Sequence, residues 1–105
     1  MTSASDLAAQ LDHAQRLLVE FLRVDLDLAF ALLRRAEIER AANNTEHEQA
    51  TVAKVLEALS TVRHLSKRIL NPKLRGEIDA RVREFESALA AHRLSATSLD
   101  RDRIS

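Results

Sequence analysis

Apolar residues recur at helical spacing through the middle of the chain. Between residues 45 and 70 they stand mostly three or four apart, which places them on one face of a helix, at Val52, Val55, Leu56, Leu59, Val62, Ile69 and Leu70. Thr45 and Glu48 have the spacing of a capping box, in which each side chain binds a free backbone N–H of the first turn. The pattern therefore predicts a helix over 45–70.

A second helix is predicted directly after the dipeptide Asn71-Pro72. Pro disfavours helical conformation in the residue before it, so the first helix ends there. Asn is a good N-cap and Pro is well tolerated at the first helical position, so the next helix begins there. Its narrow apolar stripe is Leu74, Ile78, Val82, Phe85 and Leu89. We expect this helix to end near Leu94, which makes residues 1–94 one domain and residues 95–105 a disordered polar tail.

The first part of the chain, residues 5–42, carries a longer stripe. It runs through Leu7, Leu11, Ala14, Leu18 and Phe21 and continues at Leu28 and Leu32, with Asp25 in line between. No Gly or Pro interrupts these residues. Two alternatives stay open: one long helix over 5–42, which we favour, or a break near Val24 at which Asp25 caps a separate helix.

These patterns together predict an all-α fold. The expected architecture is an antiparallel up-down bundle of three long helices, or of four if the first helix breaks. One Gly and one Pro leave almost no material for the hairpin turns of a β protein. The expected core is Leu32, Ala36, Val52, Leu56, Leu59, Val62, Ile69, Leu74, Ile78, Val82, Phe85 and Leu89.

The helix lengths predict an unpartnered apolar surface. At 1.5 Å per residue the first helix spans roughly 57 Å against roughly 39 Å for 45–70, so it overhangs by roughly 20 Å. Residues 26–33 are also apolar around most of the helix, which is typical of burial on more than one side. Folding back of residues 5–22 is one solution, and pairing with a second copy, as a homodimer, is the one we favour. The expected interface is Leu7, Leu11, Leu18, Phe21, Leu22, Leu26 and Phe30.

Composition narrows the class of protein. The chain of 105 residues has no Cys, which excludes disulfides, Cys-bound zinc and thiol catalysis. It has no apolar run near the ~20 residues of a membrane span, and Met1–Ser5 lacks the pattern of a signal peptide. We therefore expect a cytoplasmic protein with no membrane partner.

Charge suggests a second candidate surface. The formal net charge is zero, which argues against a general nucleic-acid binder. Residues 62–75 nevertheless carry only basic charges, at Arg63, Lys67, Arg68, Lys73 and Arg75. Such cations around a helix corner can contact phosphates, although no aromatic side chain stands among them for base stacking. A polyanion- or nucleic-acid-binding corner is the alternative function, and a solvated basic face is the interpretation that we prefer.

His64 belongs to a short motif, His64-Leu65-Ser66-Lys67. It resembles the phosphate-accepting histidine segment of phosphotransfer four-helix bundles, in which a Lys follows the His at this distance. The chain departs from that motif at Arg68, where the family has a small Gly. The resemblance covers four residues and implies, as a third alternative, a signalling protein phosphorylated on His64.

Other chemistry is not predicted. The only Gly, Gly76, lies within a helix and forms no phosphate-binding loop. Metal-binding bundles use Glu-x-x-His pairs, and the residues three before the histidines are Gln10, Asn44, Thr61 and Leu89. Glu46, His47 and Glu48 stand in a first helical turn, where acids favour the positive end of the dipole. We predict no catalytic residue, metal or cofactor, and a non-enzymatic module that binds itself or another protein, by association with the fold class alone.

Overall fold

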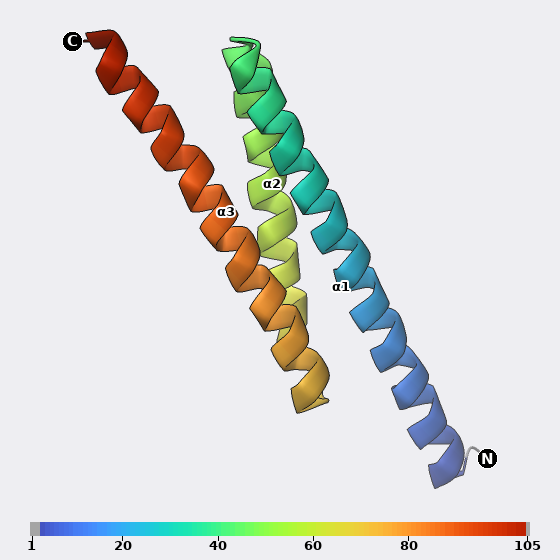
Figure 1. Ribbon diagram of the computed structural model, residues 1–105. Helices are drawn as coiled ribbons and strands as arrows, with labels where there is room; N and C mark the ends of the chain where they lie inside the picture. The colour runs from blue at the N-terminus through green and yellow to red at the C-terminus, as the bar shows by residue number, and fades with distance from the viewer. Residues whose placement is uncertain (1–2, 105) are drawn as a thin grey trace.

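The chain folds into three helices. The structure is a computed structural model that describes the backbone of residues 3–104 and the side chains of residues 3–95. Helix α1 spans Ala4–Ala41, α2 spans Thr45–Ser66 and α3 spans Pro72–Ile104 (Figure 1). The predicted all-α class with three long helices is confirmed.

Helix α1 is continuous over 38 residues. It begins with a capping box, in which the Ser3 hydroxyl accepts from the Asp6 N–H and the Asp6 carboxylate accepts from the Ser3 N–H. It turns into α2 through Asn43, whose φ of 58° is a conformation that Asn tolerates better than most residues. The single long helix is therefore correct, and the alternative break near Val24 with a cap at Asp25 is wrong.

Helix α2 begins at Thr45 as predicted, but its capping interaction and its end differ from the prediction. Asn44 is its N-cap and makes no hydrogen bond through its side chain. The predicted capping box of Thr45 and Glu48 is wrong, because the Glu48 carboxylate binds Arg40 of α1 at 2.6 Å instead. The helix ends at Ser66 rather than at residue 70, and the Ser66 hydroxyl donates to the carbonyl of Arg63.

Helix α3 begins as predicted. The Asn71 side-chain oxygen accepts from the N–H groups of Lys73 and Leu74, at 2.9 and 3.2 Å, so Asn71 is the N-cap. The helix continues beyond the expected end near Leu94 to Ile104. Side chains after Ser95 lie outside the described residues, so the polar tail over 95–105 stays a prediction.

The core lies where the three helices meet. Phe85 of α3 is fully buried, and its ring meets that of Phe30 of α1 edge to face, with centroids 5.0 Å apart. Most of the predicted core residues are buried, while Leu32, Val52 and Leu74 are half-buried and Leu56 is exposed. Ala36 of α1 is buried as predicted, but α1 buries five further residues that the predicted core lacked, namely Val19, Leu22, Leu26, Ala29 and Leu33.

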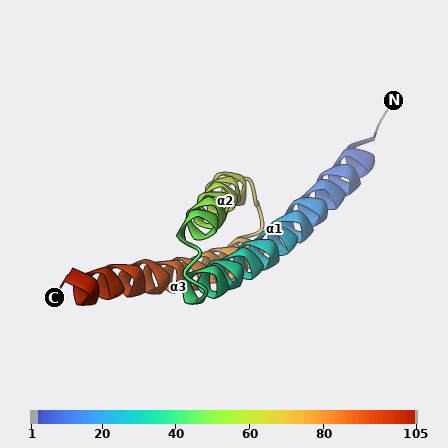
Figure 2. The same cartoon turned by 90° about the horizontal axis from the view of Figure 1, so that it is seen from above.

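The molecule is long and flat, with extents of 71 × 22 × 15 Å. The chain turns back at 42–44 and at 67–71, and α2 lies over one side of the layer that α1 and α3 form (Figures 1 and 2). The N-terminal end of α1 extends past the other two helices (Figure 1). The expected overhang is confirmed, and residues 5–22 do not fold back, because they belong to the continuous α1.

Candidate interaction surface and polar cluster

The main candidate site is an apolar row on the outside of α1. Its members, the outer seam, stand three, four, three, four and three residues apart, at Ala14, Leu17, Phe21, Val24, Leu28 and Ala31. All of them are exposed; Phe21 shows 50% and Val24 66% of its surface to solvent. Single exposed apolar residues are ordinary, but a contiguous exposed apolar row is typical of an interaction surface.

The outer seam repeats the buried row of the same helix. The buried residues of α1, from Val19 to Ala36, follow the same spacing five positions further along. Five residues correspond to a rotation of about 140° on a helix with 3.6 residues per turn. Helix α1 thus has two apolar seams on well-separated sides. We call the buried row from Val19 to Ala36 the inner seam; α2 and α3 cover this seam and leave the outer seam exposed. Spacings of three and four are those of helix pairs that pack knobs into holes.

The expected interface residues divide between these two sides. Leu7, Leu11 and Phe21 are exposed, in keeping with a free surface. Leu22 and Leu26 have no exposed surface and belong to the core, so their place in the interface is corrected. Leu18 and Phe30 are half-buried against the core. The interface prediction mixed both seams of α1, because residues 26–33 are apolar around most of the helix.

Three exposed residues of the outer seam were missed by the prediction, namely Leu17, Val24 and Leu28. Their signal was present, because the row from Ala14 to Ala31 keeps alternating steps of three and four. Which of several overlapping apolar rows faces outward depends on where α2 and α3 pack. A single helix does not contain that information.

Asp25 lies at the boundary between the two seams. Its side chain is half-buried, and its Oδ2 atom is buried without a hydrogen-bond partner. Removal from water disfavours the charged form, so burial raises the pKa of the Asp25 carboxyl above its usual 3.8. The single chain already buries part of the Asp25 side chain, without a second subunit.

The basic corner stands where α2 turns into α3. Arg63 pairs with Glu86 of α3 at 2.9 Å, and Arg75 lies 3.9 Å from Asp79 of its own helix. Lys67, Arg68 and Lys73 are exposed at the turn. The structure thus brings the predicted cations to one corner, and two of them meet carboxylates of the same chain.

His64 lies on an exposed position of α2. Its neighbours in the short motif differ in environment, since Leu65 is half-buried and Ser66 is buried. The histidine is thus accessible from solvent, as phosphorylation would require.

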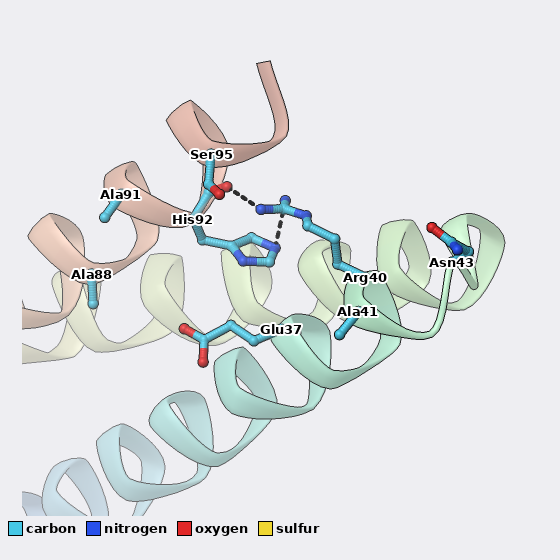
Figure 3. Close-up of a pocket in the computed structure, with 8 residues that line it drawn as sticks. All are labelled: Glu37, Arg40, Ala41, Asn43, Ala88, Ala91, His92 and Ser95. Atoms are coloured by element: carbon cyan, nitrogen blue, oxygen red, sulfur yellow. Dashed lines mark hydrogen bonds between the residues drawn. The ribbon is translucent and has the colours of Figure 1, made fainter. Parts of the chain in front are cut away.

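A pocket opens between the C-terminal part of α1 and α3, with a volume of about 730 Å³ (Figure 3). Arg40 and His92 line this pocket and form a polar cluster with Glu48 of α2, in which the His92 side chain is almost completely buried. The Arg40 guanidinium donates through Nε and Nη2 to Glu48 Oε1, at 2.9 and 2.6 Å. It also donates through Nη1 to the backbone carbonyl of His92 (Figure 3).

The polar cluster joins all three helices. His92 Nε2 lies 2.8 Å from Arg40 Nη2 and 3.0 Å from Glu48 Oε1. One imidazole nitrogen either accepts from Arg40 or donates to Glu48, so the tautomer decides which contact is a hydrogen bond. Arg40 is engaged by partners of its own chain, and the rest of the pocket includes Ala41, Ala88 and Ala91. We interpret the cluster as a structural contact that holds the three helices together.

Within residues 3–95, no group of three or more His, Cys, Asp or Glu side chains could hold a metal ion. No helix in the described part of the chain combines the length and the apolar character that crossing a membrane needs. The chain matches no protein-family model, no curated protein and no solved structure.

Proposed function

We propose that the chain is a non-enzymatic helical module that forms a homodimer through the outer seam of α1. The observation that carries this proposal is the repetition of the core-forming pattern on the outside of the same helix. A helix with apolar residues on two sides is stable when both are covered. The single chain covers one side, and a second copy supplies a matching helix for the other.

The size of the surface predicts a dimer that dissociates on dilution. A helix is about 10 Å across, so contact along residues 7–38 covers roughly 500 Å² of each copy. Stable interfaces average about 800 Å² per partner. We therefore expect the weight-average mass to change with protein concentration.

Sedimentation equilibrium over a concentration series tests the proposal. The wild-type chain should approach twice the 11.8 kDa of one copy as concentration rises. The variant Phe21→Glu/Leu28→Glu places charges within the outer seam and should stay monomeric with unchanged helix content. Leu94→Glu is the matched control, because Leu94 is 70% exposed on α3, and it should dimerise like the wild type. A wild-type chain that is monomeric at every concentration would refute the proposal.

Substitutions at Leu18 or Phe30 would be a poorer test. Both side chains pack against the core, so a Glu there would also lower the free energy of unfolding. Loss of the dimer in such a variant would not separate a broken interface from an unfolded chain.

Binding of a different protein by the outer seam is the main competing outcome. Polyanion binding by the basic corner has weaker support, because Arg63 and Arg75 already contact carboxylates of the same chain. Phosphorylation of His64 is supported by its exposure alone. Neither alternative explains why α1 has a second apolar seam.

A further inference from the structure

We infer, on the basis of the proposed function, that two copies of α1 pair antiparallel about a two-fold axis at the midpoint between Leu22 and Arg23. The outer seam is small at both ends, at Ala14 and Ala31, and large between them. A two-fold dimer uses the same patch on both copies, so the patch must be complementary to itself. A row that is small at both ends and large between them, read from either end, satisfies that condition in the antiparallel direction, with the larger Phe21 set against the smaller Val24.

The residue pairs follow from the position of the axis. Each outer-seam residue faces the residue that is equally far from the midpoint on the other copy. Leu17 therefore faces Leu28 of the second copy, and Phe21 faces Val24 of the second copy. The small residues face each other as well, which lets the two helices approach closely at both ends of the row.

Pairing of two α1 helices about the same axis also covers the exposed apolar residues that lie outside the outer seam. Leu7 is 57% exposed and Ile38 is 69% exposed, near opposite ends of α1. They are equally far from the midpoint, so each would pack against the other on the second copy. Leu11 comes beside Leu32 of the second copy at the flank of the contact. One axis thus gives an apolar neighbour to every large exposed apolar residue of α1.

Charge at the ends of the contact distinguishes antiparallel from parallel pairing. Gln10 and Arg35 continue the spacing of the outer seam beyond Ala14 and Ala31, and both are exposed. A parallel pair in register would place Arg35 against Arg35 of the second copy. The antiparallel pair places Arg35, which lies 3.6 Å from Glu39 of its own helix, against the neutral Gln10 of the second copy and so avoids a contact between two cations.

Both directions bring two carboxylates together at the flanks, but the antiparallel one involves a carboxylate that has a cation beside it. In a parallel pair, the flanking positions bring Glu20 beside Asp25 of the second copy, without a cation between them. In the antiparallel pair, Glu20 comes beside Asp27 of the second copy. Asp27 already forms an ion pair with Arg81 at 2.7 Å, which offsets part of the repulsion between Asp27 and Glu20 of the second copy.

Engineered cysteines test the direction of pairing, because the natural chain has none. The single variants Leu17→Cys and Leu28→Cys are oxidised separately and as an equal mixture. Antiparallel pairing predicts a disulfide between the two variants in the mixture and little cross-linking of either alone. Residue 17 lies roughly 16 Å along the axis from its own copy in that arrangement, and a disulfide needs Cα atoms within about 7 Å.

The outcomes separate this inference from the proposed function. Efficient cross-linking of Leu17→Cys to itself, in a chain that sediments as a dimer, would overturn the antiparallel direction and leave the homodimer standing. A chain that sediments as a monomer and forms no cross-link would overturn both. Peptide mapping of the non-reduced dimer identifies which positions are joined.

A charge substitution gives an independent test without oxidation. Gln10→Glu places a carboxylate against Arg35 of the second copy twice in the antiparallel dimer. It should tighten the dimer about two- to tenfold at low salt, as expected for two exposed ion pairs. In a parallel dimer the same change brings two Glu residues together and weakens it. Gln10→Ala is the matched control and should change the dimer affinity little.

Discussion

The side chain of Gln15 binds the backbone of Leu70 across 55 positions of the sequence, with Oε1 accepting from the Leu70 N–H at 2.8 Å. Its Nε2 group also donates to the carbonyl of Arg68, at 3.1 Å. One amide of α1 thus satisfies two polar groups of the turn that joins α2 to α3. The contact fixes the turn against α1 at the point where the overhang of α1 begins.

Replacement of Gln15 by Ala should loosen this turn. The variant loses two hydrogen bonds to the backbone, and their groups become accessible to water, so the free energy of unfolding should fall by about 1 kcal/mol. Urea denaturation followed by circular dichroism measures the change. Gln10→Ala is the control, because Gln10 is exposed on the same helix. Equal stability of the two variants would contradict a role for Gln15.

The polar cluster should contribute more to stability than the turn. Arg40→Ala removes the cation that holds Glu48 and the carbonyl of His92, and it leaves a partly buried carboxylate without its partner. Breaking one side of a buried pair costs about 3–5 kcal/mol, and the partial exposure of this one places the expected loss near the lower limit. Thermal unfolding measures the effect.

A double-mutant cycle tests the coupling within the cluster. Arg40→Met/Glu48→Met removes both charges together and should be more stable than Arg40→Met alone, since no unpaired charge is left buried. Arg16→Met is the control, because the Arg16–Asp12 pair is exposed and should contribute less than about 1 kcal/mol. Additive effects of the Arg40 and Glu48 substitutions would show that the two residues are not coupled.

The basic corner should bind nucleic acid only weakly and through phosphates alone. Any affinity for single-stranded RNA should fall steeply with salt, since binding by cations releases counterions. The variant Lys67→Ala/Arg68→Ala/Lys73→Ala should then lose most of it, whereas Arg34→Ala, on α1, should not. Fluorescence anisotropy at low salt measures this affinity, and strong binding that survives high salt would contradict the prediction.

Several elements of the fold follow from local rules. Asn71-Pro72 starts and caps α3 because of backbone geometry alone, and the structure shows that cap, whereas α2 already ends at Ser66. The absence of Gly and Pro from residues 5–42 favoured one unbroken helix over a break near Val24, and the structure shows one helix over Ala4–Ala41. These features depend on a few neighbouring residues, which is why the sequence contains them.

Features that depend on packing between helices were not predictable in the same way. Glu48 has the right spacing from Thr45 for a capping box, but its carboxylate contacts Arg40 and His92 of the other two helices instead. Likewise, Leu22 and Phe21 are adjacent and both apolar, yet one is buried and the other half exposed. The choice depends on how α1 is rotated against α2 and α3, and a helix with two apolar seams permits both rotations.

Asp25 should make the chain less stable at neutral pH than at mildly acidic pH. Burial raises the pKa of the Asp25 carboxyl in the folded chain above 3.8, its usual value, so the folded state keeps this proton to a higher pH than the unfolded state. The contribution of Asp25 to the free energy of unfolding therefore falls as pH rises from 3.8 through the folded pKa. Above that pKa, the folded chain holds a charge that it solvates poorly.

Asp25→Asn removes the titration and should stabilise the chain at pH 7 by about 1 kcal/mol, the scale of a partly buried polar group without a partner. The gain should shrink as pH falls toward 4, because wild-type Asp25 then becomes neutral as well.

Asp27→Asn is the matched control two residues away. It breaks the ion pair with Arg81 and should be neutral or slightly destabilising at pH 7. Urea denaturation of the three proteins between pH 4 and pH 7, at a concentration where the wild type is monomeric, measures both effects. If the difference in free energy of unfolding between Asp25→Asn and the wild type does not change with pH, ionisation of the Asp25 carboxyl does not destabilise the folded chain, and the prediction is wrong.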